Sequence, residues 1–229
     1  AYLDSRGLDQ KVIRSFGLGY APDHWESARE YLKSRGYDDK QLLDAGITVE
    51  NKEKGRIYDR FRNRVIFPII QPRGLVLGFG GRVMDASLPK YLNSPDSPVF
   101  NKSENLFGLN LAARVRPLEY LILAEGYMDV IALHQFGFSQ AVASLGTSLT
   151  EEQARLMRRY ASDIYIAYDG DAAGQKATLR ALDILKEAGC RGRVILFPDG
   201  LDPDEVLKRY GPEYFRKLMD RSQAVREQY

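Results

Sequence analysis

The clearest indication of the fold is the segment Ile164-Tyr165-Ile166-Ala167-Tyr168-Asp169-Gly170-Asp171. A short apolar run, typical of a buried strand, leads into an acidic turn, and an amphipathic helical pattern begins after Asp171. The same association of apolar run and acidic cluster recurs at Glu125–Asp129 and at Asp202–Asp204. Strands that alternate with helices in this way predict a parallel sheet covered by helices.

The other strands and helices of the second half of the chain, after about Pro117, follow from the same pattern of apolar runs and helical stretches. We expect strands at Tyr120–Ala124, Ala141–Ala143, Ile164–Tyr168 and Val194–Phe197. Thr150 and Gln153 have the spacing of a capping box at the start of one helix, and Asp171 is placed to cap another that Gly189 ends. The second half therefore reads as strand, helix, strand, helix.

The three acidic clusters predict a site for divalent metal. Because ligands bind at the carboxyl ends of parallel strands, Glu125, Asp169 and the Asp202 region are expected at one edge of the sheet. Six carboxylates in one place require cations between them or protonation of some of them, and hard oxygen ligands favour Mg²⁺ or Mn²⁺. Each cluster alone is better explained as a turn or a helix cap, but three at successive strand ends are not.

The first half has a different pattern. Up to residue 46, short helical stretches each end at a glycine, at Gly7, Gly17, Gly36 and Gly46. Two apolar runs, residues 65–70 and 75–79, flank a turn and predict an antiparallel hairpin in which Pro68 belongs at an edge or bulge. Residues 85–103 read as a long loop. We place the domain boundary near Pro117, which gives an α+β subdomain at residues 1–116 and a parallel α/β domain at 117–229.

Charge is divided unevenly along the chain. The 229 residues include 33 Lys or Arg and 31 Asp or Glu, for a net charge of +2. Between Arg56 and Arg116, ten basic residues stand against four acidic ones, which gives +6 and leaves −4 for the remainder. Such runs more often form a solvated surface. Because these basic residues stand among Gly, Pro and Asn, we interpret them as groups that bind a polyanion.

Composition excludes several other classes of protein. A hydrophobic fraction of 44% and a charged fraction of 28% are ordinary for a soluble protein. Without an apolar run near the roughly 20 residues of a membrane helix, or the pattern of a secretory signal, we expect a cytoplasmic protein that contacts no membrane. Cys190 is the only cysteine and the histidines are His24 and His134, so we expect neither a disulfide nor a structural zinc.

Several motifs together resemble the catalytic core of bacterial DnaG-type primases. Those of the second half are similar to the Toprim domain and comprise Glu125–Asp129, Ala143–Thr147, Tyr168–Gly174 and Asp202–Glu205. Those of the first half are similar to the amino-terminal part of the core and comprise Tyr58–Pro68, Gly78–Arg82 and Pro89–Pro95. Toprim domains also occur in topoisomerases, and the first-half motifs narrow the resemblance to primases.

The resemblance implies roles for particular residues. Glu125, Asp169 and Asp171 are the implied catalytic residues and primary metal ligands, with two or more Mg²⁺ or Mn²⁺ ions, and Asp129, Asp202 and Asp204 complete the metal site. The implied contacts to nucleotide phosphates or to the template–primer backbone are Arg62, Arg64, Arg82, Lys90, Tyr91, Asn93 and Lys102.

The resemblance also implies a function and partners. Primases are DNA-dependent RNA polymerases that make short primers, so single-stranded DNA, nucleoside triphosphates and an RNA primer are the expected partners. A replicative helicase is expected to bind through a carboxyl-terminal domain that this chain lacks, as it lacks a zinc-binding domain, and the chain reads as an excised fragment whose activity alone is in doubt.

Three alternatives stay open from the sequence. The first is phosphodiester cleavage, as in Toprim nucleases and in topoisomerases, which also need a nucleophilic tyrosine from a separate domain. The second is a module that binds single-stranded nucleic acid without catalysis. A phosphohydrolase that uses Asp169 and Asp171 is a weaker alternative because it leaves the first-half motifs unexplained. Loss of activity in Glu125→Gln would separate catalysis from binding alone.

Overall fold

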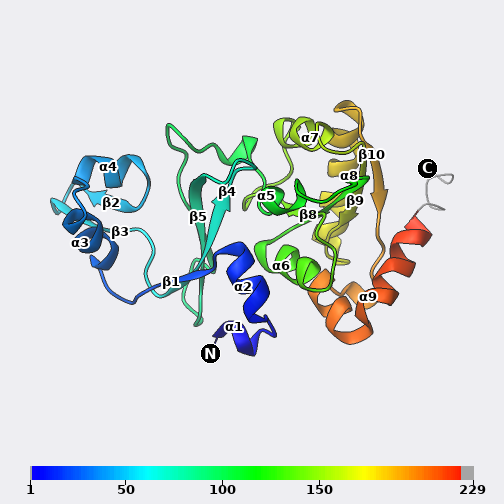
Figure 1. Cartoon of the computed structure of the whole chain (residues 1–229), viewed down its shortest axis with the longest axis horizontal. Helices are drawn as coiled ribbons and strands as arrows, with labels where there is room; N and C mark the ends of the chain where they lie inside the picture. The colour runs from blue at the N-terminus through cyan, green and yellow to red at the C-terminus, as the bar shows by residue number, and fades with distance from the viewer. Residues whose placement is uncertain (1, 223–229) are drawn as a thin grey trace. The chain divides into compact units, whose positions relative to one another are not determined.

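The computed structural model describes residues 2–222, and its contacts divide the chain into two units (Figure 1). The first unit runs to Ile69 and includes Val76–Lys102, and the second comprises Ile70–Leu75 and the residues from Ser103 onward. Residues 103–116 group with the second unit in this division, and the boundary near Pro117 stays a prediction. No helix among residues 2–222 is long and apolar enough to cross a membrane.

The helices of the first unit end at glycines, as the sequence predicts. Gly7, Gly17, Gly36 and Gly46 follow them with φ of 75°, 66°, 94° and 70°, a backbone conformation that glycine adopts without a steric penalty. The four helices are α1 (Tyr2–Ser5), α2 (Gln10–Phe16), α3 (Ser27–Ser34) and α4 (Asp39–Asp44).

The first unit contains a four-stranded sheet of order β1-β4-β5-β6 and a separate antiparallel pair, β2 and β3. The predicted hairpin is present: β4 and β5 are neighbours, and Gln71 N–H donates to the Leu75 carbonyl oxygen at 3.0 Å in the turn between them. The strands are β1 (Gly19–Ala21), β2 (Thr48–Asn51), β3 (Arg56–Asp59), β4 (Arg64–Ile70), β5 (Val76–Val83) and β6 (Tyr91–Asn93).

Two expectations for this unit need correction. Residues 85–103 are not a continuous loop, because Tyr91–Asn93 pair with Arg82–Gly80 as an antiparallel edge strand. Pro68 lies on an interior strand rather than on an edge strand. It is tolerated there because β1 pairs only with Arg64, Val65 and Ile66, so its pairing with β4 ends before Pro68.

The second unit is built on a parallel sheet of order β10-β9-β7-β8. The bounds of β7 (Tyr120–Ala124) and β8 (Ala141–Ala143) are as predicted, and β9 (Asp163–Ala167) begins one residue earlier than expected. The predicted strand Val194–Phe197 is wrong, since β10 comprises Arg191–Val194. Its polar start is tolerated because β10 is an edge strand, on which Arg191 and Arg193 form ion pairs with Asp163.

Helices cover both faces of this sheet. On one face, α7 and α8 pack against the sheet through a buried cluster that includes Leu123, Ile166, Met157 and Leu185. On the other face, α6 packs against α9, and the rings of Phe138 and Phe215 lie 4.7 Å apart between their centroids. The helices are α5 (Leu109–Ala112), α6 (Tyr127–Gln135), α7 (Glu151–Arg158), α8 (Ala172–Glu187) and α9 (Pro203–Ser222, interrupted at Gly211), with the 3₁₀ turns η1 (Lys102–Glu104) and η2 (Pro198–Gly200).

The predicted caps of this unit are confirmed. Thr150 and Gln153 form a reciprocal capping box on α7, Asp171 accepts from Gly174 N–H at the start of α8, and Gly189 has a φ of 78° after its end. The fold is therefore mixed α/β with a parallel sheet, in agreement with the sequence.

Candidate metal and nucleic-acid site

The predicted acidic residues lie at the carboxyl edge of the parallel sheet. Glu125 directly follows β7, Asp169 lies two residues beyond β9, and Asp202 lies beyond β10 and η2. Asp129 occupies the first turn of α6, whose N-cap is Gly126. Sequence order and strand direction thus place these groups in one region of the second unit.

Two glycines allow the loops at this edge to approach closely. A methyl group at Gly174 would lie 2.1 Å from the Asp169 carbonyl oxygen, and one at Gly170 would lie 2.9 Å from Cα of Gly200. Asp169 N–H donates to Glu125 Oε1 at 3.2 Å, which joins the loops after β9 and β7. The position of Asp169 therefore depends on glycines at 170 and 174.

Burial and mutual repulsion act together on the carboxylates. Burial, together with the charges of Asp202 and Asp169, raises the pKa of Asp129 well above its ordinary value. Burial and then Asp169 raise the pKa of Glu125, and burial and then Asp202 raise the pKa of Asp169. The pKa of Asp202 is likewise raised, first by burial. These carboxylates repel one another, and a bound cation would relieve that repulsion.

Three of the acidic side chains also have local partners. Asp171 caps α8, and Asp202 Oδ1 accepts from Glu205 N–H at 2.7 Å at the start of α9. Asp204 is buried and accepts from Lys208 Nζ at 2.7 Å. These interactions occupy some carboxylate oxygens and leave others for a further ligand.

The side chains of this cluster fit a metal ion in their chemistry but not in their present arrangement. Among residues 2–222, no group of three His, Cys, Asp or Glu side chains is arranged so that it could hold an ion. The chemistry of the donors nevertheless suits one, because Asp169 Oδ1 is buried without a hydrogen-bond partner amid carboxylates of raised pKa. A buried carboxylate oxygen without a partner is costly in the low dielectric of the protein interior, and a bound cation would stabilise it.

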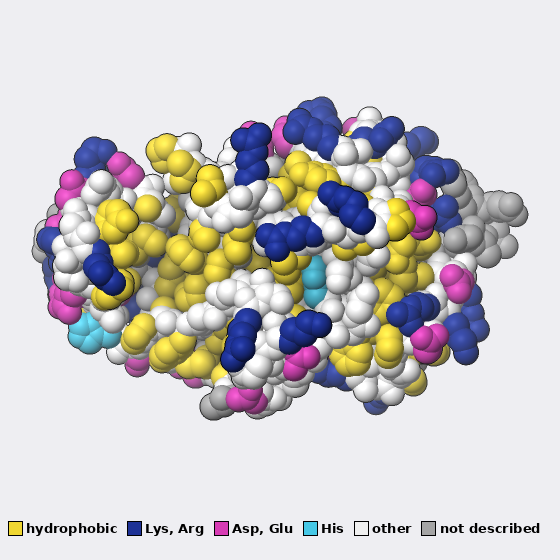
Figure 2. Space-filling view, viewed as in Figure 1, with side chains coloured by type: hydrophobic (Ala, Val, Ile, Leu, Met, Phe, Trp, Pro, Cys, Tyr) yellow, Lys and Arg dark blue, Asp and Glu magenta, His cyan; other side chains and the backbone are white. Residues whose placement is uncertain are grey.

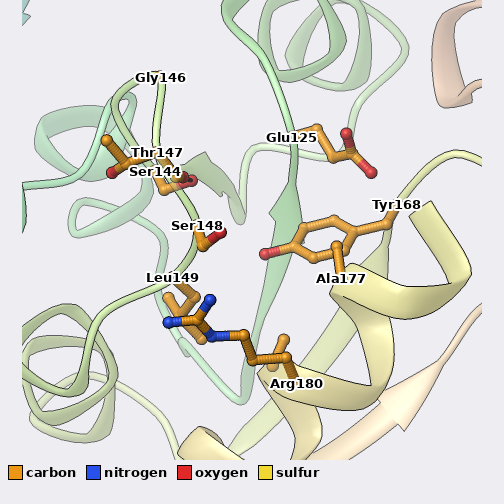
Figure 3. Close-up of a pocket in the computed structure, with 10 residues that line it drawn as sticks. Glu125, Ser144, Gly146, Thr147, Ser148, Leu149, Tyr168, Ala177 and Arg180 are labelled. Atoms are coloured by element: carbon orange, nitrogen blue, oxygen red, sulfur yellow. Dashed lines mark hydrogen bonds between the residues drawn. The ribbon is translucent and has the colours of Figure 1, made fainter. Parts of the chain in front are cut away.

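A pocket of about 280 Å³ adjoins Glu125 (Figure 3). Besides Glu125, it is lined by the loop after β8, by Tyr168 and by one face of α8. Burial raises the pKa of the Tyr168 hydroxyl, with a further contribution from the Glu125 charge. The sequence motifs include the loop and Tyr168, but the position of Arg180 in the pocket was missed. The spacing of Ala177, Arg180 and Ala181 on one helical face is the signal that was available.

In the first unit, Arg62 lies on aromatic rings. Its guanidinium carbon is 4.1 Å from the ring centroid of Trp25 and 5.2 Å from that of Tyr58, and these two rings meet edge to face. Trp25 is 55% exposed. A cation fixed on an exposed aromatic ring suits nucleic acid, which offers both phosphates and base faces. Sequence reasoning missed Trp25 and Tyr58, although Trp25 is the only tryptophan and Tyr58 begins a quoted motif.

Arg82, Lys90 and Tyr91 form a second group in the same unit. The Arg82 guanidinium carbon lies 5.8 Å and Lys90 Nζ 6.0 Å from the ring centroid of Tyr91. Arg82 Nε is buried without a hydrogen-bond partner, so it is a donor that an anionic or carbonyl oxygen would satisfy.

The other predicted basic-site residues have structural contacts. Arg64 is buried and donates to the carbonyl oxygens of Gly81 (3.2 Å), Pro89 (2.8 Å) and Lys90 (3.4 Å). The Asn93 carbonyl accepts from Arg60, and Lys102 N–H donates to Asp96 Oδ1 at 2.9 Å. All seven predicted residues lie in the first unit. On the face in Figure 2, basic side chains of both units are interspersed with other surface rather than gathered in one patch.

Known proteins match the whole chain. A family model described as the DNA primase catalytic core, N-terminal domain, matches residues 1–113, and a Toprim-like model matches residues 122–207. The DNA primase of Clostridium acetobutylicum is 50% identical over 224 residues, which cover 98% of this chain and 37% of that protein. The DNA primase of Pseudomonas aeruginosa is 43% identical over all of this chain and 35% of that protein. The chain thus spans little more than a third of these relatives.

Solved structures agree with this match. A crystal structure of a DNA primase domain from Pseudomonas aeruginosa is 45% identical with a TM-score of 0.89, and 96% of this chain covers 70% of that one. The E. coli primase catalytic core is 43% identical with a TM-score of 0.88 (96% and 71% covered). A DnaG primase catalytic domain bound to single-stranded DNA is 43% identical with a TM-score of 0.86 (96% and 70% covered).

The parallel sheet with acidic strand ends is thus a Toprim-like domain. Joined to the preceding core domain, it shows that the chain belongs to the DnaG-type DNA primase family. This family uses divalent metal ions.

Proposed function

We propose that the chain carries the catalytic groups for synthesis of short RNA primers on single-stranded DNA. The observation that carries this proposal is the buried, unpartnered Asp169 Oδ1 within a carboxylate cluster at the edge of a Toprim-like sheet. Nucleoside triphosphates, the RNA primer and the template are the proposed partners, and a replicative helicase would contact the longer protein outside residues 1–229.

In the proposed reaction, the 3′ oxygen of one nucleotide forms a bond to the α-phosphorus of the next. The bond from that phosphorus to the bridging oxygen breaks, its electron pair leaves with pyrophosphate, and the proton of the hydroxyl passes to solvent. Mg²⁺ or Mn²⁺, in two or more copies, would lower the pKa of the attacking hydroxyl and neutralise phosphate charge.

The residues of this chain divide the remaining work. Glu125, Asp169 and Asp171 would hold the cations, with Asp129, Asp202 and Asp204 completing the negative site. Arg62, Arg82 and Lys90, which lie over aromatic rings, would bind nucleotide or template phosphates, and Tyr91, Asn93 and Lys102 would assist them. Because Arg64 already donates to three carbonyl groups, we propose that it positions the loop at residues 89–90 instead of binding phosphate.

The test compares Glu125→Gln and Asp169→Asn with the control Asp183→Asn, which removes an exposed carboxylate from α8. Mn²⁺ binding is measured by calorimetry and RNA synthesis on single-stranded DNA by gel analysis, with circular dichroism to monitor folding. We expect both site variants to remain folded and to lose metal binding and synthesis, while the control keeps both. Normal synthesis in the site variants, or cleavage of the template in its place, would contradict the proposal.

A further inference from the structure

The pocket next to Glu125 has polar as well as apolar walls, and its two ends differ in charge. In Figure 3, Glu125 and Arg180 lie at opposite ends, with the ring of Tyr168 between them. Ser144, Thr147 and Ser148 contribute hydroxyl groups along its wall. A ligand of matching chemistry would carry a bound cation at the Glu125 end and negative oxygens at the Arg180 end.

The hydroxyl-bearing loop is fixed before any ligand arrives. Ser144 Oγ donates to the Thr147 carbonyl oxygen at 2.8 Å, and Gly146 has a φ of 72° that lets the chain reverse between them. At its other end, Thr150 Oγ1 donates to the Ser103 carbonyl oxygen at 2.6 Å and accepts from Gln153 N–H. These contacts hold the loop that carries the Thr147 and Ser148 hydroxyls, and a loop held in place binds a ligand with little loss of conformational entropy.

Arg180 is the cation of this pocket. It is exposed on α8, on the face that also carries Ala177 and Ala181. Within residues 2–222 its guanidinium forms no hydrogen bond, ion pair or ring contact, whereas Arg155, Arg191, Arg193 and Arg216 all pair with acidic side chains. An unpaired guanidinium that faces hydroxyl groups is suited to a phosphate, which it can bind through two parallel hydrogen bonds.

We infer that this pocket binds the terminal phosphates of a nucleoside triphosphate, and pyrophosphate after the bond to the α-phosphorus has broken, with Arg180 as the anchoring cation. The inference rests on the proposed function, because it needs a cation at Glu125 to join the other end of the polyphosphate. A nucleotide polyphosphate fits better than a strand of nucleic acid, since the charge it carries is concentrated within the length of one pocket.

The experiment is calorimetric titration of the protein with inorganic pyrophosphate and with ATP, each with Mg²⁺. Arg180→Ala, Arg180→Lys and the control Lys186→Ala, which removes a charge from another face of the same helix, are compared with the unaltered chain. Loss of a charge-assisted pair predicts ~10-fold or greater weakening for both ligands in Arg180→Ala. Arg180→Lys should recover part of this affinity, and Lys186→Ala should bind normally.

Affinity for single-stranded DNA, measured by fluorescence anisotropy, should be unchanged in Arg180→Ala. Equal pyrophosphate affinity in Arg180→Ala and the unaltered chain, or a loss confined to the DNA measurement, would overturn the inference. Glu125→Gln distinguishes failure of the phosphate pocket from failure of the metal site. If Glu125→Gln loses Mg²⁺-dependent binding and Arg180→Ala does not, the metal site is supported and the role of Arg180 is refuted. Retained binding in Glu125→Gln counts against the proposed metal site itself.

Discussion

Substitution of Gly174 by alanine sets two physical effects of opposite sign against each other. Gly174 lies in the first turn of α8, where alanine favours the helix by up to ~1 kcal/mol over glycine. The added methyl group would, however, lie 2.1 Å from the Asp169 carbonyl oxygen and 2.9 Å from its carbonyl carbon. Both neighbours are backbone atoms, so a side-chain rotation cannot relieve the contact.

The clash should prevail. Relief requires that the Asp169 backbone move by about 1 Å, and overpacking of this kind costs roughly 1–3 kcal/mol and occasionally more. We therefore expect Gly174→Ala to lower the free energy of unfolding by up to about 2 kcal/mol after the full helix-propensity gain. A shift of this size at a proposed ligand should also weaken Mn²⁺ binding ~10-fold or more, because ligand distances tolerate about 0.2 Å.

Urea denaturation and Mn²⁺ calorimetry measure the two effects separately. Lys176→Ala provides the matched control, since it alters an exposed residue in the same helix two positions later and should change neither quantity by much. A Gly174→Ala variant that is as stable as the unaltered chain, with undiminished Mn²⁺ affinity, would refute the claim that glycine is needed to seat Asp169.

Three further predictions concern charge. Asp129→Asn should stabilise the metal-free protein at pH 7, because a raised folded-state pKa contributes stability that is lost as pH rises, and it should reduce stabilisation by Mg²⁺. Thermal denaturation with and without Mg²⁺ measures both effects, and a less stable metal-free variant would contradict the prediction. His134, whose pKa burial lowers to about 4, should stay neutral in an NMR titration down to that region, and its contribution to stability should be lost as pH falls from about 6.5; titration near pH 6.5 would oppose this. Asp59→Ala should lower the free energy of unfolding by about 2–3 kcal/mol in urea denaturation, because the buried Asp59 carboxylate accepts from Ala28 and Arg29 N–H at the start of α3. A decrease below about 0.5 kcal/mol would show that these hydrogen bonds are dispensable.

Local signals in the sequence were sufficient for most elements of the fold. Glycine at helix ends, the Thr150–Gln153 capping box and the buried runs at β7 and β8 each determine their element within a few residues, so no long-range information is needed. The strand β10 was misplaced because its first residues are polar. They form an edge strand by pairing with β9, which is distant in sequence, and Asp163 of β9 forms ion pairs with Arg191 and Arg193.

The candidate site was predictable where topology determines it. Acidic residues after parallel strands must meet at one edge, so Glu125 and Asp169 could be paired from order alone. The buried position of Arg64 could not be predicted from the sequence, because its guanidinium contacts three carbonyl groups that β5 and the loop at residues 89–90 supply. Arg180 was missed for another reason: its helical spacing places it on the face of Ala177 and Ala181, but that spacing does not show that this face borders a pocket.

The placement of the helices explains how so many carboxylates are tolerated at one edge. Three helices, α6, α8 and α9, begin there, and the partial positive charge at a helix N-terminus stabilises nearby anions. Asp171 uses that stabilisation directly as a cap. Asp202 also caps a helix, but burial raises its pKa, as burial and like charges raise that of Asp129. Loss of a capping carboxylate should therefore cost stability with or without metal, while loss of Asp129 should increase it without metal. The acidic edge thus contains a capping carboxylate, Asp171, and carboxylates of raised pKa, and we expect a cation to stabilise the second kind.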